Sequence, residues 1–247
     1  MAKIFLDIGG YLGDSVHAAL DPVFGFDCVY TFEPVESLAK QLCGIGNSRL
    51  TVIHAGMIDA DGKRIIYHAG TLAGSIYADA PSYIDEGTDV ECDFLEASRF
   101  FRENIKNGDI VYMKLNCEGA ECAILENLLA TGEINKLTEV LVDFDALKIP
   151  SQAHRVAQII DGMRAKNAPY HTPEQVQYGM INNYGGIRNW LLVTGASQAG
   201  LIRKISSVLY QLKIMLTKEY NGYYKMRVLK KLPVLRLVIN KLRGSKS

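Results

Sequence analysis

The stretch that most constrains the fold is a glycine cluster near the beginning of the chain. The apolar run Ile4 to Ile8 predicts a strand, and the helical pattern that follows continues through Leu20. Between them lie Gly9, Gly10 and Gly13. Glycines let the backbone turn sharply and let a ligand approach it closely, and free N–H groups at a helix start favour polar or negative ligand groups. Such turns hold nicotinamide cofactors, flavins, nucleotides and S-adenosylmethionine alike.

A second run narrows the kind of ligand. Cys28 to Phe32 is β-branched and aromatic, and Glu33 and Pro34 follow it. An acid at this point ends the second strand of a nucleoside-binding unit, where its carboxylate can accept both ribose hydroxyls. We therefore assign Glu33 to the ribose. The spacing alone still permits a dehydrogenase.

Strand and helix patterns then alternate along the chain, which predicts a mostly parallel α/β sheet. The further predicted strands are Leu50 to His54, Arg64 to His68, Val90 to Leu95, Ile110 to Leu115 and Glu139 to Asp145. Gln175 to Met180 and Arg188 to Thr194 are expected to form a hairpin, and so to add an antiparallel edge strand. The segment Ala69 to Ser75 is expected to be an ordinary surface loop, with a flexible segment near a ligand as the alternative.

Polar side chains gather where two of these strands end. Lys114, Asn116 and Glu118 lie at the end of one strand, and Asp143 and Asp145 lie at the end of the next. Ligands of open α/β sheets bind beyond the carboxyl ends of the strands. Three of these carboxylates could hold a divalent cation only if the strand ends converge, so a metal is left open but not supported.

Residues 3 to 195 resemble the FkbM family of S-adenosylmethionine-dependent methyltransferases. Four motifs in the family's order carry the resemblance: Asp7-Ile-Gly-Gly-Tyr-Leu-Gly13, Phe32-Glu-Pro34, Asp59-Ala-Asp-Gly62 and Lys114-Leu-Asn-Cys-Glu-Gly-Ala-Glu121. The last motif is the most specific.

The resemblance implies a class I methyltransferase fold, a Rossmann-like sheet of seven mostly parallel strands with an antiparallel last strand. It also implies methyl transfer from S-adenosylmethionine to a hydroxyl. We expect the acceptor to be a sugar hydroxyl of a polysaccharide or glycolipid, with a small polyketide-type molecule as the alternative.

The resemblance also assigns roles to residues. The residues expected to bind the cofactor are Asp7, Gly9, Gly10 and Gly13 for the methionine part, Glu33 and Pro34 for the ribose, and Ala55, Gly56 and Met57 for adenine. The resemblance places Lys114, Glu118 and Glu121 where cofactor and acceptor meet. The residues that we expect to be catalytic are Lys114, Asn116, Glu118 and Asp143.

Two residues depart from the family pattern. Tyr11 stands where the family usually has Asn, and Asn116 stands where it has Asp. An amide cannot act as a general base, so that role would move to Glu118, to Asp143 or Asp145, or to a histidine. Without such a base the protein would bind S-adenosylmethionine without catalysis, as a scaffold. A nicotinamide-dependent oxidoreductase fits only the first 34 residues.

Glu118 is our first candidate for the base or for positioning the acceptor. The competing interpretation is that Glu118 and Glu121 open a helix, where negative charge is favourable. Lys114 is equally well explained as a structural clamp on these acids or as a catalytic group.

The chain divides by charge, which suggests a domain over residues 1–196 and a helical extension over residues 197–247. Residues 201–247 hold twelve Lys or Arg and one acid, a net +11, whereas residues 1–200 hold fifteen basic and twenty-six acidic residues, a net −11. Apolar residues recur at helical spacing among these basic residues. Such a segment binds an anionic membrane surface, or it packs on the acidic domain or a second subunit. No nucleic-acid motif accompanies the charge.

The sequence also predicts where the protein works. The first predicted strand leaves no room for a signal peptide, and five cysteines without metal-ligand spacing suggest reduced thiols. We expect a cytoplasmic protein, peripheral at the inner membrane face if the basic segment binds lipid. The sequence does not decide whether it forms homo-oligomers.

Overall fold

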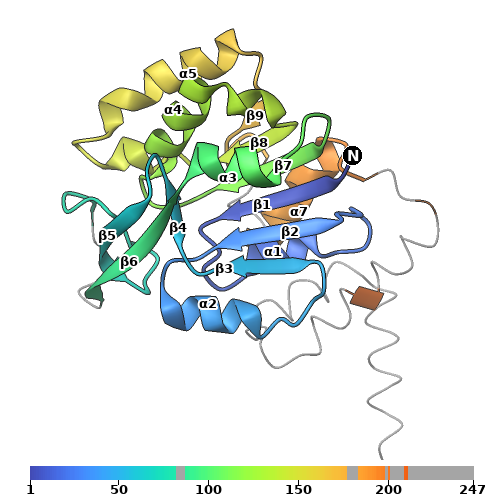
Figure 1. The fold of residues 1–247 in the computed structure, drawn as a ribbon, viewed down its shortest axis with the longest axis horizontal. Coiled ribbons are helices and arrows are strands. Elements are labelled where there is room, and N and C mark those ends of the chain that lie inside the picture. Colours follow the sequence, from blue (N-terminus) through green and yellow to red (C-terminus); the bar gives the residue numbers. More distant parts are fainter. Residues whose placement is uncertain (82–86, 177–182, 198–199, 201–208, 211–247) are drawn as a thin grey trace, which may run out of the picture. The chain divides into compact units, whose positions relative to one another are not determined.

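The structure is a computed structural model that describes residues 1–81, 87–176, 183–197, 200 and 209–210. The chain separates into two units, Met1–Leu20 with Phe24–Gln198, and Asp21–Val23 with Ala199–Ser247. Every helix and strand labelled in Figure 1 lies in the first unit. The predicted extension over residues 197–247 falls almost wholly outside the described residues. It stays a prediction, as does the domain boundary after residue 196.

The described strands form two sheets. They are β1 (Lys3–Ile8), β2 (Cys28–Phe32), β3 (Leu50–Ile53), β4 (Gly56–Ile58), β5 (Gly62–Ala69), β6 (Thr88–Glu96), β7 (Ile110–Leu115), β8 (Glu139–Val142) and β9 (Tyr170–His171). The larger sheet has the order β3-β2-β1-β7-β8-β9 with all pairs parallel, and the smaller has the order β4-β6-β5. The order of the larger sheet reverses between β1 and β7, which is the switch point where such sheets bind ligands.

Helices cover both faces of the larger sheet (Figure 1). The α-helices among the described residues are α1 (Asp14–Ala19), α2 (Glu36–Cys43), α3 (Ala97–Asn104), α4 (Glu121–Thr131), α5 (Val156–Ala165) and α7 (Asn183–Val193). The described 3-10 helices are η1 (Glu133–Lys136), η2 (Asp145–Lys148) and η3 (Ala153–Arg155). None of the described helices has the length and apolarity to cross a bilayer.

Alternation along β1 divides the core between the two faces. Ile4, Leu6 and Ile8 pack into one cluster with buried residues of α3, α4 and α5. Phe5 points the other way, with its ring centroid 6.3 Å from that of Trp190 on α7. Because β1 is buried on both faces, the polar residues that follow it can reach solvent only beyond the carboxyl ends of the strands.

The predicted class, a Rossmann-like α/β sheet, is confirmed, but the predicted C-terminal hairpin is wrong. Most of Arg188 to Thr194 belongs to helix α7, and residues 177–182 lie outside the described residues. Ile187, Trp190 and Leu191 are all buried, and their spacing of three and four is that of a helix face. Among the described residues the larger sheet therefore has six parallel strands, not seven with an antiparallel last strand.

Candidate active site

Two turns meet at the switch point. The first turn, residues 9–13, joins β1 to α1, and the second turn, residues 116–120, joins β7 to α4. Gly9 has a φ of +88°, and a Cβ there would lie 2.0 Å from the backbone oxygen of Asn116. The Asn116 N–H donates to the oxygen of Ile8 at 3.2 Å. The two backbones therefore touch, and only glycine fits at position 9.

A buried ion pair lies beneath the first turn. Asp7 and Lys114 are register partners on β1 and β7, and Lys114 Nζ lies 3.2 Å from Asp7 Oδ1. Lys114 Nζ also donates to the Gly9 oxygen at 2.7 Å, and Thr31 Oγ1 donates to Asp7 Oδ2 at 3.1 Å. Burial raises the pKa of Asp7, and the Lys114 charge opposes that rise. The ion pair that Lys114 makes is thus with Asp7, and Asp7 supports the first turn from inside the protein.

Glu33 holds the first turn from the neighbouring strand. It is almost fully buried, and its carboxylate accepts the N–H of Tyr11 at 2.8 Å and of Val35 at 2.9 Å. Tyr11 has a φ of +44°, a left-handed conformation that is unusual outside glycine and Asn. Burial raises the pKa of Glu33. Each carboxylate oxygen uses one acceptor position on these bonds, so both can still accept a hydroxyl.

The segment predicted to flank adenine begins beside Glu33. The Glu33 N–H donates to the oxygen of Ile53, the last residue of β3, at 3.1 Å. Ala55, Gly56 and Met57 are buried, and the Met57 side chain belongs to the main core. A Cβ at Gly56 would lie 2.2 Å from the Phe94 ring. What this segment can offer a ligand is therefore chiefly its backbone.

Glu121 holds the second turn from the first residue of α4. Its side chain is fully buried, and its carboxylate accepts the N–H of Cys117 at 2.9 Å and of Gly119 at 3.0 Å. Burial raises the pKa of Glu121 to about 7. Between the two donors lies Glu118, which is left-handed at a φ of +50°. Glu121 thus opens a helix, as one interpretation of the sequence held, and it also stabilises the turn that carries Glu118.

Carboxyl groups of raised pKa surround the second turn. Burial, followed by the nearby Asp145 charge, raises the pKa of Glu118 to about 8 and of Asp143 to about 6. The predicted strand over Glu139 to Asp145 is shorter, because β8 ends at Val142 and Asp145 opens η2. Lys148 forms an ion pair with Asp145 and opposes both rises. At neutral pH this edge therefore holds a largely protonated Glu118 beside a largely ionised Asp143.

The Asn116 amide adds no base to this group. Asn116 is half-buried, and its backbone rather than its side chain carries the contact with the first turn. Within the part of the chain that the structure describes, no three His, Cys, Asp or Glu side chains are grouped to hold a metal ion.

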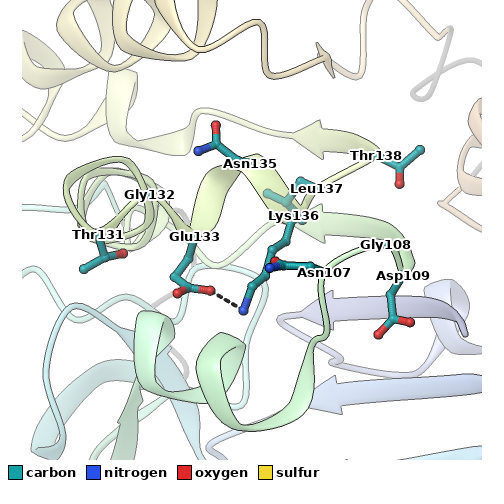
Figure 2. A pocket seen from close by; sticks show the side chains of 10 residues that line it. All are labelled: Asn107, Gly108, Asp109, Thr131, Gly132, Glu133, Asn135, Lys136, Leu137 and Thr138. Atoms are coloured by element: carbon teal, nitrogen blue, oxygen red, sulfur yellow. Dashed lines mark ion pairs between the residues drawn. The ribbon is translucent and has the colours of Figure 1, made fainter. Parts of the chain in front are cut away.

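A hollow of about 470 Å³ lies at the other end of the strands, where β7 and β8 begin (Figure 2). Its lining residues include Gly108, just before β7, and Thr138, just before β8. Lys136 lies 2.6 Å from Glu133 and donates to the oxygen of Ile105 at 2.9 Å, so it neutralises the end of α3. These charges are explained by the helix end, and the hollow is separate from the two turns.

Two residues near Glu118 were not predicted from the sequence. Ser75 was expected in a surface loop, yet it is 2% exposed and its hydroxyl donates to the Glu118 oxygen at 2.6 Å. No local pattern predicts a contact across so many residues. Lys148 could have been found, because it lies three residues after Asp145, on the same side of a helical turn.

Comparisons with known proteins give one distant match. No family model and no curated protein matches the sequence. The crystal structure of Methyltransferase FkbM from Methylobacillus flagellatus KT is similar, with 16% identity and a TM-score of 0.40. The match covers 65% of this chain and 37% of that chain. A likeness at this level says nothing of the reaction or the substrate.

Proposed function

We propose that this chain transfers a methyl group from S-adenosylmethionine to a hydroxyl, and that the hydroxyl belongs to a sugar in a polysaccharide or glycolipid. One observation carries the proposal: two buried-glutamate turns meet at the switch point, one suited to a ribose and the other carrying Glu118. The four-motif resemblance suggests the cofactor and the class of acceptor.

The residues of the first turn fit the cofactor. Glu33 retains acceptor capacity for two ribose hydroxyls, and Gly9 and Gly13, both at a φ of +88°, allow the tight turn beside it. Residues 55–57 would flank adenine through their backbone. When bound, S-adenosylmethionine supplies an electrophilic methyl group. Asp7 is held by Lys114 and would act on the ligand only through the shape of the turn.

Glu118 is the proposed base. A sugar hydroxyl is a weak acid, so a positioned group must take its proton as it attacks. A carboxylate whose pKa is raised to about 8 is a stronger base than an ordinary one, because its protonated form is favoured. Asp143 is the second acceptor for that proton. Asn116 can orient the hydroxyl by hydrogen bonding but cannot deprotonate it.

Two other functions follow from particular features. A non-catalytic S-adenosylmethionine-binding or scaffold protein is favoured by Asn116, which stands where an acid is expected. A small polyketide-type acceptor is the alternative to a glycan. The basic segment 201–247 lies almost wholly outside the described residues. We propose that it binds an anionic membrane surface, which would bring the site to a lipid-linked acceptor.

The test is transfer of radiolabelled methyl from S-adenosylmethionine to three acceptor sets: lipid-linked glycans in anionic vesicles, soluble oligosaccharides and phenolic or polyketide alcohols. The chain is compared with Glu118→Gln and with Glu103→Gln, an exposed acid on α3. The proposal expects label in a glycan set, lost in Glu118→Gln and kept in Glu103→Gln. Label in the small alcohols alone would show that the acceptor is a small molecule and not a glycan. Cofactor binding with no label in any set would support the non-catalytic alternative.

A further inference from the structure

A short strap runs from the smaller sheet to the second turn. It consists of residues 75–79, in the connection between β5 and β6. Its first residue, Ser75, pairs with Tyr67 of β5 through both backbone bonds, at 2.8 and 3.1 Å. Its second residue, Ile76, packs against the core of the larger sheet and against the cluster beneath the smaller one. The strap therefore starts from a fixed position.

The outer end of the strap is fixed as well. The Asp79 carboxylate accepts the N–H of Ser151 at 2.8 Å and its hydroxyl at 2.9 Å. Between the two ends, the Tyr77 ring packs on the second turn, since a Cβ at Gly119 would lie 3.1 Å from Tyr77 Cδ2. Arg155 donates to the Tyr77 hydroxyl at 3.5 Å. The strap is thus held on both sides of the turn.

The Ser75 hydroxyl connects the strap to Glu118. It donates to the Glu118 backbone oxygen at 2.6 Å and accepts the Tyr77 N–H at 3.2 Å. Its single proton is therefore committed to Glu118.

Glu118 needs such support because of its backbone. A non-glycine residue at a φ of +50° is strained, and it keeps that conformation only where the surroundings fix it. Glu121 fixes the N–H groups on either side of it, and Ser75 fixes its carbonyl. We infer that Ser75 is a positioning residue, whose hydroxyl holds the second turn so that the Glu118 carboxyl keeps its half-buried place. That the Glu118 carboxyl acts as a base rests on the proposed function, but its positioning by Ser75 does not.

The test is the titration of the Glu118 side-chain carboxyl by ¹³C NMR, assigned with Glu118→Gln. In Ser75→Ala the turn loses one of its restraints and the carboxyl gains water, so its pKa should fall by about one unit or more. Ser75→Thr keeps the hydroxyl and should keep the wild-type titration. Tyr77→Phe is the matched control, because it alters the same strap without touching the bond to Glu118.

An unchanged titration in Ser75→Ala would overturn the inference, as would an equal shift in Tyr77→Phe, which would mean general loosening of the strap. If Ser75→Thr does not fold, the comparison of Ser75→Ala with Tyr77→Phe still decides. S-adenosylhomocysteine affinity, measured on the same samples, separates the two proposals. It should change less than about twofold in Ser75→Ala, since Glu33 is untouched. Wild-type protein that binds no S-adenosylhomocysteine would sink the proposed function and leave the titration result standing.

Discussion

The first and second turns have the same construction. Each follows a central parallel strand and contains one left-handed residue other than glycine, which is Tyr11 in the first turn and Glu118 in the second. Each is also held by a buried glutamate that accepts backbone N–H groups. The glutamate of the first turn reaches across from the neighbouring strand, whereas that of the second belongs to the helix the turn leads into. At both turns, therefore, a buried carboxylate stabilises a left-handed backbone conformation by accepting neighbouring N–H groups.

The two turns differ in charge. Beneath the first, Asp7 has a buried lysine as its partner. Around the second, Glu118, Asp143 and Asp145 share Lys148, whose side chain is 57% exposed. The cation that balances the second group is therefore screened by water. Burial, followed by the Asp145 charge, raises the pKa of Glu118 to about 8 and of Asp143 to about 6. The acid beneath the first turn is therefore balanced by a buried cation, and the acids around the second turn by an exposed one.

We expect the greatest loss of stability from a substitution at the point where the two turns touch. Gly9→Ala places a Cβ against the Asn116 oxygen and also forces alanine to a φ of +88°, so unfolding free energy should fall by about 3 kcal/mol or more. Gly108→Ala is the control, with a φ of +90° and nothing within 4 Å, and should cost about 1 kcal/mol. Urea denaturation measures both. Equal losses would show that the turns are not in contact.

The next effect separates the turns by function. Glu118→Gln should lower kcat for methyl transfer about 100-fold, or about 2.7 kcal/mol, while cofactor affinity stays within about twofold. The wild-type rate should rise as pH increases through about 8, because only ionised Glu118 can take a proton. Steady-state kinetics from pH 6 to 9 measure both. A flat profile, or a loss of cofactor binding with kcat unchanged, would assign Glu118 to binding.

A smaller effect concerns stability and pH. Glu118, Glu121 and Asp143 have folded pKa values above their ordinary ones, so between about pH 4.5 and 8 the folded state binds more protons than the unfolded state. Stability should therefore fall as pH rises across that window. Urea midpoints at pH 5 and pH 8 should show a smaller difference in Glu118→Gln than in wild type or Glu103→Gln. A wild type that becomes more stable toward pH 8 would contradict the assigned burial.

The smallest effect measures strain in the second turn. At pH 5, where Glu118 is protonated, Glu118→Gly should stabilise the protein by less than about 1 kcal/mol, because relief of the left-handed strain is partly offset by unfolded-state entropy. Asn167→Gly, at a φ of +51°, is the comparison, and it should gain nothing because Asn tolerates that conformation. Thermal unfolding measures the stability change of both variants. A clear loss of stability in Glu118→Gly would mean that the Glu118 side chain, not strain, dominates.

Local patterns predicted where most residues of the candidate site lie in the fold. The glycines after β1, the acid after β2 and the polar residues after β7 all came from strand periodicity and the parallel-sheet rule. Helix α7 was misassigned because Asn, Tyr and Gly at its start resemble a turn, whereas the buried residues Ile187, Trp190 and Leu191 recur at the spacing of a helix face. The buried role of Ser75 had no sequence signal, because it depends on how the smaller sheet packs.

We propose that the first turn binds a sulfur nucleoside through Glu33. This proposal is tested most directly by calorimetric titration of the whole chain with S-adenosylmethionine, S-adenosylhomocysteine and NAD. Glu33→Ala is compared with Glu36→Ala, an exposed acid on α2. We expect micromolar binding of both sulfur nucleosides but not of NAD, weakened at least about tenfold in Glu33→Ala and unchanged in Glu36→Ala. Folded protein that binds neither sulfur nucleoside, or prefers NAD, would contradict it.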